Sequence, residues 1–131
     1  MIKKFDFSPN HTKKSRNNSK IKFVIVHYTG MQSAIESLKR LKDPKSKVSC
    51  HYFIDNKGVI IQLVKDNKIA WHAGKSKWKN YRNLNDLSIG IELQNKGHKF
   101  GYKNFPNSQL NSFIKLSKKL KKKNLIKSCN F

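Results

Sequence analysis

The stretch Ile21-Lys22-Phe23-Val24-Ile25-Val26-His27-Tyr28 decides the fold class. Apolar and β-branched residues follow one another almost without interruption, which is typical of a central strand that is covered on both faces. The strand ends at His27 and Tyr28, and the turn Thr29-Gly30 follows directly. We therefore expect a sheet with structure packed on each side of it.

Short elements follow this strand along the chain. Residues 33–41 have apolar side chains at helical spacing, with Ser33 and Glu36 in the positions of a capping box. The remaining predictions are a hairpin of strands 51–55 and 59–64, a loop over 70–85, a strand over 87–93 and a lysine-rich amphipathic helix over 108–123. The order predicts an α/β fold, with a mixed central β-sheet flanked by helices.

The length of 131 residues is enough for a single domain and too short for two ordinary ones. Residues 1–20 are predicted to form a polar N-terminal arm, because turn formers and polar residues dominate 8–20. The domain proper is then 21–131. Neither a signal-peptide segment nor a bilayer-spanning run is apparent, so we expect a cytoplasmic product without a membrane span.

The formal net charge of +22 arises from 29 basic and 7 acidic residues, and Arg16, Arg40 and Arg82 are the only arginines. Proteins that read nucleic acids favour arginine, whose planar fork pairs bidentately with phosphate and guanine. Two interpretations stay open, an anionic partner and a solvated lysine-rich surface. The lysines are spread along the chain, which favours the second and predicts no specific nucleic-acid partner.

Two side chains at strand ends are candidates for chemistry. His27 ends a buried strand where loops form a cleft, so it is either a metal ligand or a packed structural histidine. In 87–93 the alternation places Glu92 on the face opposite Ile89 and Ile91. A carboxylate there either handles a proton or forms a surface ion pair.

The other histidines and the tryptophans allow two interpretations each. His51 and His72 either contact a ligand or satisfy backbone groups, and His98 is expected to be solvated. Trp71 and Trp78 either stack on a sugar or peptide or pack within the domain.

Five strings occur in order: Val24-Ile25-Val26-His27-Tyr28-Thr29-Gly30, Val48-Ser49-Cys50-His51-Tyr52, Ile61-Gln62-Leu63-Val64, Ala70-Trp71-His72-Ala73-Gly74-Lys75-Ser76 and Ser88-Ile89-Gly90-Ile91-Glu92-Leu93. Together they resemble the successive motifs of the type-2 N-acetylmuramoyl-L-alanine amidases. The matches span roughly 21–95, and the predicted helix over 108–123 lies where that family has one. Five ordered matches are far more specific than any single one.

The resemblance implies an amidase/peptidoglycan-recognition-like fold with a substrate groove over one end of the sheet. It also implies a zinc hydrolase that cuts the bond between N-acetylmuramic acid and the L-alanine of the stem peptide, in cell-wall turnover or recycling. His27 matches the first zinc ligand, and Glu92 matches the residue that assists proton transfer. Trp71 and His72 would line the groove for muropeptides, and His51 matches a position next to it.

The sequence departs from the family at its C-terminal end. The family completes its zinc site with a histidine in a Gly-His string and a later aspartate, and no position here matches either ligand. Residues 125–129 resemble the start of the strand that precedes them, so we expect a domain truncated before these two ligands. The alternatives are a peptidoglycan amidase, a non-catalytic muropeptide-binding module without a complete zinc site, and a nucleic-acid binder that depends on charge.

Overall fold

The computed structural model describes residues 2–124 and 126. In chain order the elements are β1 (Ile2–Phe5), β2 (His11–Thr12), η1 (Asn18–Lys20), β3 (Phe23–Tyr28), α1 (Ala34–Lys42), β4 (Tyr52–Ile54), β5 (Ile60–Gln62), β6 (Ile69–Ala70), β7 (Lys77–Trp78), β8 (Tyr81–Arg82), α2 (Leu84–Leu87), β9 (Ser88–Leu93), η2 (His98–Phe100) and α3 (Asn107–Lys123). The predicted central strand, helices and hairpin all occur in this list.

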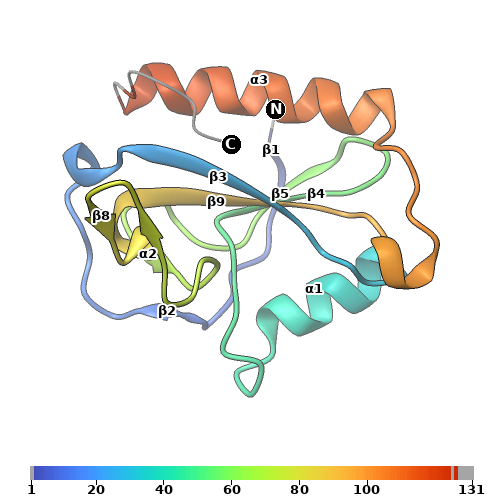
Figure 1. Cartoon of the computed structure of the whole chain (residues 1–131), viewed down its shortest axis with the longest axis horizontal. Helices are drawn as coiled ribbons and strands as arrows, with labels where there is room; N and C mark the ends of the chain where they lie inside the picture. Colours follow the sequence, from blue (N-terminus) through green and yellow to red (C-terminus); the bar gives the residue numbers. More distant parts are fainter. Residues whose placement is uncertain (1, 125, 127–131) are drawn as a thin grey trace.

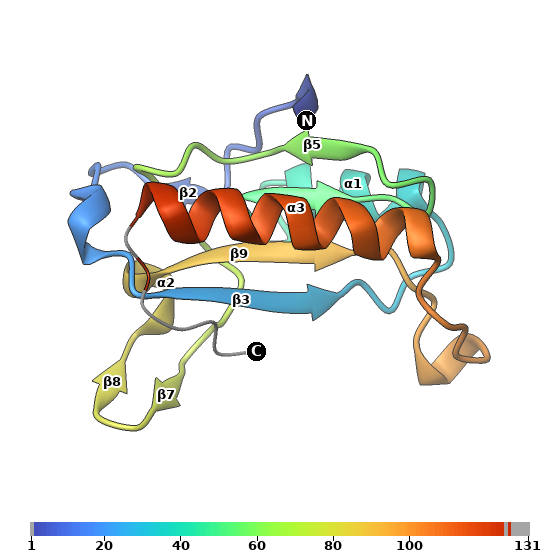
Figure 2. The same cartoon turned by 90° about the horizontal axis from the view of Figure 1, so that it is seen from above.

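A five-stranded sheet with the order β1-β5-β4-β9-β3 forms the centre of the domain. β9 pairs in parallel with both β3 and β4, whereas β4 and β5 form an antiparallel hairpin. Helix α3 covers one face of the sheet and α1 lies on the other face (Figures 1 and 2). The prediction of a mixed central sheet flanked by helices is confirmed.

The period of two along each strand divides the side chains between two cores. Towards α3, the buried side chains include Val24, Ile89 and Ile91, which pack with Leu116 and Leu120 of the helix. The other face carries a smaller cluster, formed by Leu41, Cys50, Phe53, Ile61 and Leu63. His27 and Glu92, one residue out of phase with the isoleucines, therefore project away from α3.

The structure confirms the predicted N-terminal cap of α1 and shows which residues form the buried side of α3. Ser33 Oγ accepts a hydrogen bond of 3.1 Å from the backbone N–H of Glu36, so α1 begins where the capping pattern places it. Ile114, an apolar residue of the amphipathic helix predicted over 108–123, is 47% exposed and not part of the buried side of α3. The buried stripe passes through Gln109, Leu116 and Leu120, and position 114 falls outside it at 3.6 residues per turn.

Residues 1–20 differ from the expected polar arm, because much of this segment is part of the folded domain. β1 adds a parallel edge strand to β5, and β2 pairs with β6. Ser8 is buried and its hydroxyl donates to Leu41 O at 2.6 Å, at the end of α1. Asn10 is also buried, and its amide donates to Asp43 O and Val48 O. The N-terminal segment thus holds α1 and the loop after it.

Arg16 connects the same segment to the opposite side of the domain. Its guanidinium is buried and donates to the backbone carbonyls of Asp66, Asn85 and Asp86 at 3.0–3.1 Å. Burial lowers the pKa of Arg16 to about 10, and the charges of Asp66 and Asp86 act in the opposite direction. The side chain remains charged near neutral pH, and it donates to three backbone carbonyl groups from two separate segments of the chain.

The predicted loop over 70–85 contains a small two-stranded hairpin, β7 and β8, beside β6. Lys77, Trp78, Tyr81 and Arg82 are all exposed in it, but the ring of Tyr81 contacts the buried ring of Phe23 edge to face, with 5.1 Å between the ring centroids. Within the described residues, no helix combines the length and the apolar character needed to cross a membrane.

Replacing Arg16 by alanine is expected to lower the free energy of unfolding by about 3 kcal/mol, because three backbone carbonyls lose a charged donor. The measurement is urea unfolding followed by circular dichroism. Arg82→Ala is the matched control, since Arg82 is exposed on β8, and it is expected to change stability by less than about 0.5 kcal/mol. Equal effects of the two substitutions would show that Arg16 does not hold the domain together.

Candidate active site

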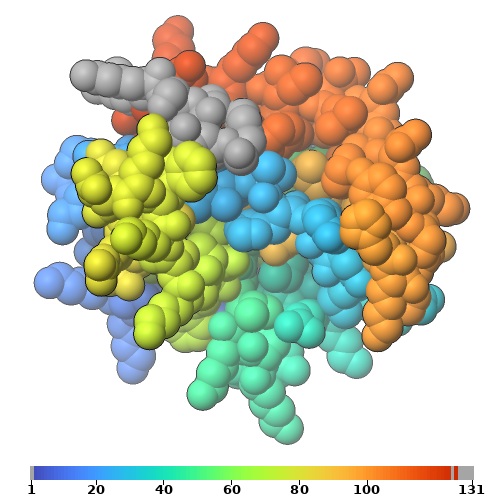
Figure 3. All heavy atoms as spheres, viewed as in Figure 1, coloured from blue at the N-terminus to red at the C-terminus, as the bar shows by residue number. Residues whose placement is uncertain are grey.

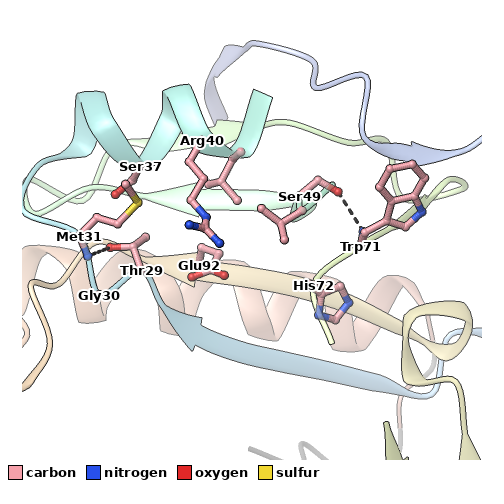
Figure 4. A pocket seen from close by; sticks show the side chains of 11 residues that line it. Thr29, Gly30, Met31, Ser37, Arg40, Ser49, Trp71, His72 and Glu92 are labelled. Atoms are coloured by element: carbon pink, nitrogen blue, oxygen red, sulfur yellow. Dashed lines mark hydrogen bonds between the residues drawn. The ribbon is translucent and has the colours of Figure 1, made fainter. Parts of the chain in front are cut away.

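His27 and Glu92 stand side by side because β3 and β9 pair in parallel with His27 opposite Glu92. A cleft of about 310 Å³ opens at Glu92, and its lining also includes Thr29, Arg40, Trp71 and His72. Figure 4 shows these side chains converging from α1, from β9 and from the segment after β6. In Figure 3 the end of β3 lies between the β7–β8 hairpin and the loop that contains η2.

A chain of hydrogen bonds orients the two histidines. The Ser88 hydroxyl donates to Leu84 O at 2.6 Å, so Ser88 Oγ accepts from His72 Nε2 at 3.0 Å. Neutral His72 then has its lone pair on Nδ1, which accepts from His27 Nε2 at 3.0 Å. By this assignment the lone pair of His27 is on Nδ1, the nitrogen that remains available to a ligand.

Burial keeps these histidines uncharged. Burial lowers the pKa of His27, and burial together with the neighbouring His51, His27 and Arg16 holds the pKa of His72 well below 6.5. A neutral imidazole is the form that can accept a proton or coordinate a metal. The hydrogen-bonded pair is therefore in its ligand-binding form at neutral pH.

Glu92 carries an unsatisfied carboxylate in the cleft. Its Oε2 is buried and has no hydrogen-bond partner within the described part of the chain. Burial raises the pKa of Glu92 to about 7, and the positive charge of Arg40 offsets part of this rise. A carboxyl group with a pKa near neutrality can both take up and release a proton in a reaction at that pH.

His51 lies beneath the site and not on its surface. Its exposed fraction is 0%, its Nδ1 accepts from the Gly90 N–H at 3.0 Å, and its Nε2 lies 2.8 Å from Lys68 O. Burial, and then the charge of Arg16 at 3.2 Å, lower the pKa of His51 to about 4. The expected contact with substrate is not supported, because both ring nitrogens already have partners. His51 instead fixes β9 below the cleft.

Trp71 and His72 are held at the cleft by backbone contacts. The N–H of Trp71 donates to Ser49 Oγ at 2.9 Å, and its indole Nε1 donates to Thr12 Oγ1 at 3.2 Å. Asn85 Oδ1 accepts from the N–H groups of His72 and Ala73. The side chain of Trp71 thus lines the cleft with its ring nitrogen already bonded.

Sequence reasoning missed three residues that orient the site: Arg16, Asn85 and Ser88. In the sequence, Ser88 is only a polar residue of a predicted strand and Asn85 only a turn-forming residue of a predicted loop, so neither pattern indicates a role in the site. Arg16 did carry a signal, because it is an arginine in a chain that otherwise uses lysine. The sequence could not show that its guanidinium is buried beside His51.

Gly90 provides the space for the His72 ring. A methyl group on this glycine would lie 2.5 Å from His72 Cδ2 and 2.7 Å from His72 Nδ1, distances that real Cβ atoms do not show. A side chain at position 90 would therefore push the His72 ring away from His27.

The described residues do not by themselves complete a zinc site. A zinc ion bound by a protein usually needs at least three side-chain ligands. Within residues 2–124 and 126, no three histidine, cysteine, aspartate or glutamate side chains are grouped so that they could hold a metal ion. His27, through Nδ1, is the side chain whose position and protonation state suit one ligand.

The fold and the cleft define an α/β domain with a mixed sheet and a histidine and a glutamate paired at its rim. Residues 17–129 match the N-acetylmuramoyl-L-alanine amidase family, and the chain belongs to that family. The resemblance inferred from the five sequence motifs is thereby confirmed.

Two relatives show how much of the family domain is present. The chain is 42% identical over 85 residues to the N-acetylmuramoyl-L-alanine amidase AmiD of Escherichia coli, a match that covers 60% of this chain and 30% of AmiD. It is 28% identical over 132 residues to the 1,6-anhydro-N-acetylmuramyl-L-alanine amidase AmpD of Haemophilus influenzae. This match covers 82% of this chain and 72% of AmpD. The sequence match therefore spans less than a third of AmiD.

Two solved structures share the fold. E. coli AmiD, in complex with anhydro-N-acetylmuramic acid-L-Ala-D-γ-Glu-L-Lys, superposes with a TM-score of 0.73 at 34% identity, covering 88% of this chain and 48% of AmiD. AmpDh3 of Pseudomonas aeruginosa, in complex with an anhydromuramic pentapeptide, superposes with a TM-score of 0.70 at 30% identity. This match covers 86% of this chain and 48% of AmpDh3.

Gly90→Ala is expected to lower the free energy of unfolding by about 2 kcal/mol and to displace the His72 ring, because the new methyl group overlaps that ring. Urea unfolding and the NMR signals of the His72 ring measure the two effects. Gly101→Ala is the control. Its φ of 74° costs about 1 kcal/mol, but nothing lies within 4 Å of the added methyl group, so the His72 signals should not move. Unchanged His72 signals in Gly90→Ala would contradict the packing described here.

Acid is expected to destabilise the domain through His51. Its pKa is about 4 in the folded state and 6.5 in the unfolded state, so the unfolded chain binds the proton more tightly. The stabilisation is complete above pH 6.5 and is lost as the pH falls towards 4, a change of about 3 kcal/mol. Urea unfolding between pH 7.5 and 4 measures it.

His51→Gln should remove this contribution of about 3 kcal/mol from the measured profile, to which Glu92 contributes with the opposite sign because its pKa is raised to about 7. His98→Gln, at an exposed position, is the control. If the pH dependence were equally steep in His51→Gln, another group would be its source.

Proposed function

We propose that this chain belongs to a peptidoglycan amidase that hydrolyses the bond between N-acetylmuramic acid and the L-alanine of the stem peptide. The observation that carries the proposal is the position of His27 beside two residues that line the cleft, opposite Glu92 on β9 and 3.0 Å from His72, in a chain of the N-acetylmuramoyl-L-alanine amidase family. The substrate class is muropeptides, such as the anhydromuramic peptides bound to AmiD and AmpDh3.

Different residues of this chain are proposed to transfer protons, to orient His27 and to contact the substrate. Glu92 would take a proton from the attacking water and pass it to the leaving amine, for which a pKa of about 7 is suitable. His72, held by Ser88 and Asn85, orients His27. Trp71 offers an aromatic wall to the sugar or the peptide, with its indole nitrogen already bonded to Thr12.

Zinc is the cofactor proposed for the reaction, and His27 is proposed as one of its ligands. When bound, zinc activates water at neutral pH and polarises the carbonyl group. The other ligands would have to come from outside residues 2–124 and 126. A cytoplasmic location, with a role in recycling cell-wall fragments, remains a prediction from the sequence.

The second candidate is a muropeptide-binding module without catalysis. It is favoured by the lack of a three-ligand group among the described residues. It predicts binding of the same ligands, but it gives no reason for an unpaired carboxylate at Glu92. The enzyme accounts for both His27 and Glu92, so it is the function that the site supports best.

Glu92→Gln is expected to reduce release of the stem peptide by at least about a hundredfold, because the amide cannot shuttle the proton. Muropeptide affinity and zinc content should remain within about threefold of the unsubstituted protein. The assay is chromatography of stem peptide released from anhydro-N-acetylmuramic acid-L-Ala-D-γ-Glu-L-Lys. It is run on the 131-residue chain and on the chain joined to the family's C-terminal Gly-His and aspartate segment.

His27→Ala separates metal binding from proton transfer, since it should lower zinc content as well as activity. Lys119→Gln, on the exposed side of α3, is the control and should leave both unchanged. Muropeptide binding without peptide release by either form would identify a binding module. Release that persists in Glu92→Gln would remove Glu92 from the reaction.

A further inference from the structure

Arginine is rare enough in this chain for each occurrence to need a reason. The sequence has 29 basic residues, of which 3 are arginines and the other 26 are lysines. Arg16 is explained by its buried contacts to three carbonyl groups, which a lysine could not make together. Arg82 lies on the exposed hairpin. Arg40 remains, and it stands over the cleft.

Arg40 reaches the cleft from the last turns of α1. Figure 4 shows its guanidinium directed towards the carboxylate of Glu92. The two groups are nevertheless not an ion pair, because the ion pairs among the described residues join Lys4 and Lys42 to Asp6 and Lys123 to Asp66. The guanidinium also makes no side-chain hydrogen bond within the described part of the chain. Its five donors are available to a ligand.

A second cleft, of about 540 Å³, adjoins the first on the outer side of α1. Gly30, Met31 and Arg40 line both clefts, and of these three only Arg40 is charged. The second cleft also contains Lys39, Glu36 and Asp43. A peptide that extends from Glu92 into the second cleft would have to pass the guanidinium of Arg40.

We propose that Arg40 is a specificity-determining residue that binds the free α-carboxylate of the second residue of the stem peptide. This assignment rests on the proposed function. In a muropeptide with γ-linked glutamate, the α-carboxylate of that glutamate is the first negative charge after the scissile amide. A planar guanidinium binds such a carboxylate bidentately, whereas the lysines abundant elsewhere act as point charges.

The position of Arg40 suits a carboxylate that is near the reacting bond but not at it. Glu92 would repel a ligand carboxylate placed directly beside it, and Arg40 lies between Glu92 and the second cleft. The ligand carboxylate is therefore expected on the side of the guanidinium away from Glu92. The recognition selects muropeptides with a free α-carboxylate over those in which it is amidated.

Two ligands that differ at one group test the assignment. N-Acetylmuramoyl-L-Ala-D-Glu has the free α-carboxylate, and N-acetylmuramoyl-L-Ala-D-isoglutamine has an amide there, while both keep the γ-carboxylate. Titration calorimetry on the 131-residue chain with a chelator present measures binding without hydrolysis. The unsubstituted chain should prefer the acid by about tenfold to a hundredfold, the range of a charge-assisted bidentate contact.

Arg40→Gln should reduce this preference to less than about threefold, chiefly by weakening binding of the acid. Arg40→Lys should retain part of the preference, because it keeps the charge but loses the fork. Arg82→Gln removes the same charge from the exposed hairpin and should keep the full preference. Circular dichroism of each variant verifies that it is folded.

The outcomes separate this assignment from the function on which it rests. If the unsubstituted chain binds both ligands equally, or if Arg40→Gln keeps the preference, Arg40 does not recognise the carboxylate, although the proposed function stands. If the chain binds neither ligand, the assignment of Arg40 fails, while the proposed function is decided separately by the release of stem peptide. A preference that is lost equally in Arg82→Gln would show general charge attraction and would overturn the assignment.

Discussion

The parallel pairing of β3 with β9 is the constraint on which the site depends. It sets His27 opposite Glu92 and points both side chains away from α3, while Val24, Ile89 and Ile91 fill the core beneath that helix. A slip of one residue in either strand would exchange these faces and bury His27 or Glu92 in the α3 core. Alternate residues of the same two strands form the core under α3 and the candidate active site. The packing of the apolar residues therefore also fixes the positions of His27 and Glu92.

A buried polar layer below the cleft supports this arrangement. His51 accepts a hydrogen bond from the backbone of β9 and donates to Lys68 O, the guanidinium of Arg16 lies 3.2 Å from its Nε2, and the ring of His72 occupies the space above Gly90. Each of these groups has a partner, which is the condition under which buried polar groups stabilise a fold. Glu92 Oε2 is the exception within the cleft. An unpaired acceptor is costly in a folded protein, and a ligand or a reacting proton is a reason for its retention.

The central strand, the hairpin and the two long helices could be predicted because their residues carry strong local patterns. β1 could not, because Ile2–Phe5 contains two lysines and its parallel partner β5 is distant in the chain. His27 and Glu92 could be singled out as polar residues ending apolar strands. Other features could not be predicted, because they depend on tertiary contacts that no local pattern encodes. These are the burial of His51, the contacts of Arg16 and the hydrogen bond from the His72 N–H to Asn85. The exposure of Ile114 has a simpler cause, since a one-residue error in a helical stripe moves a side chain by 100°.

The strand order also determines when the domain can form during synthesis on the ribosome. β3 leaves the exit tunnel well before its partner β9, which lies some sixty residues later, after the β4–β5 hairpin. The pairing of β4 with β5 is local in sequence and can form early, whereas the apolar face of β3 must wait for β9 and α3. Until then, a hydrophobic strand is exposed on a nascent chain with a large positive charge. The repulsion among its lysines keeps neighbouring chains apart during the interval in which aggregation would otherwise compete with folding.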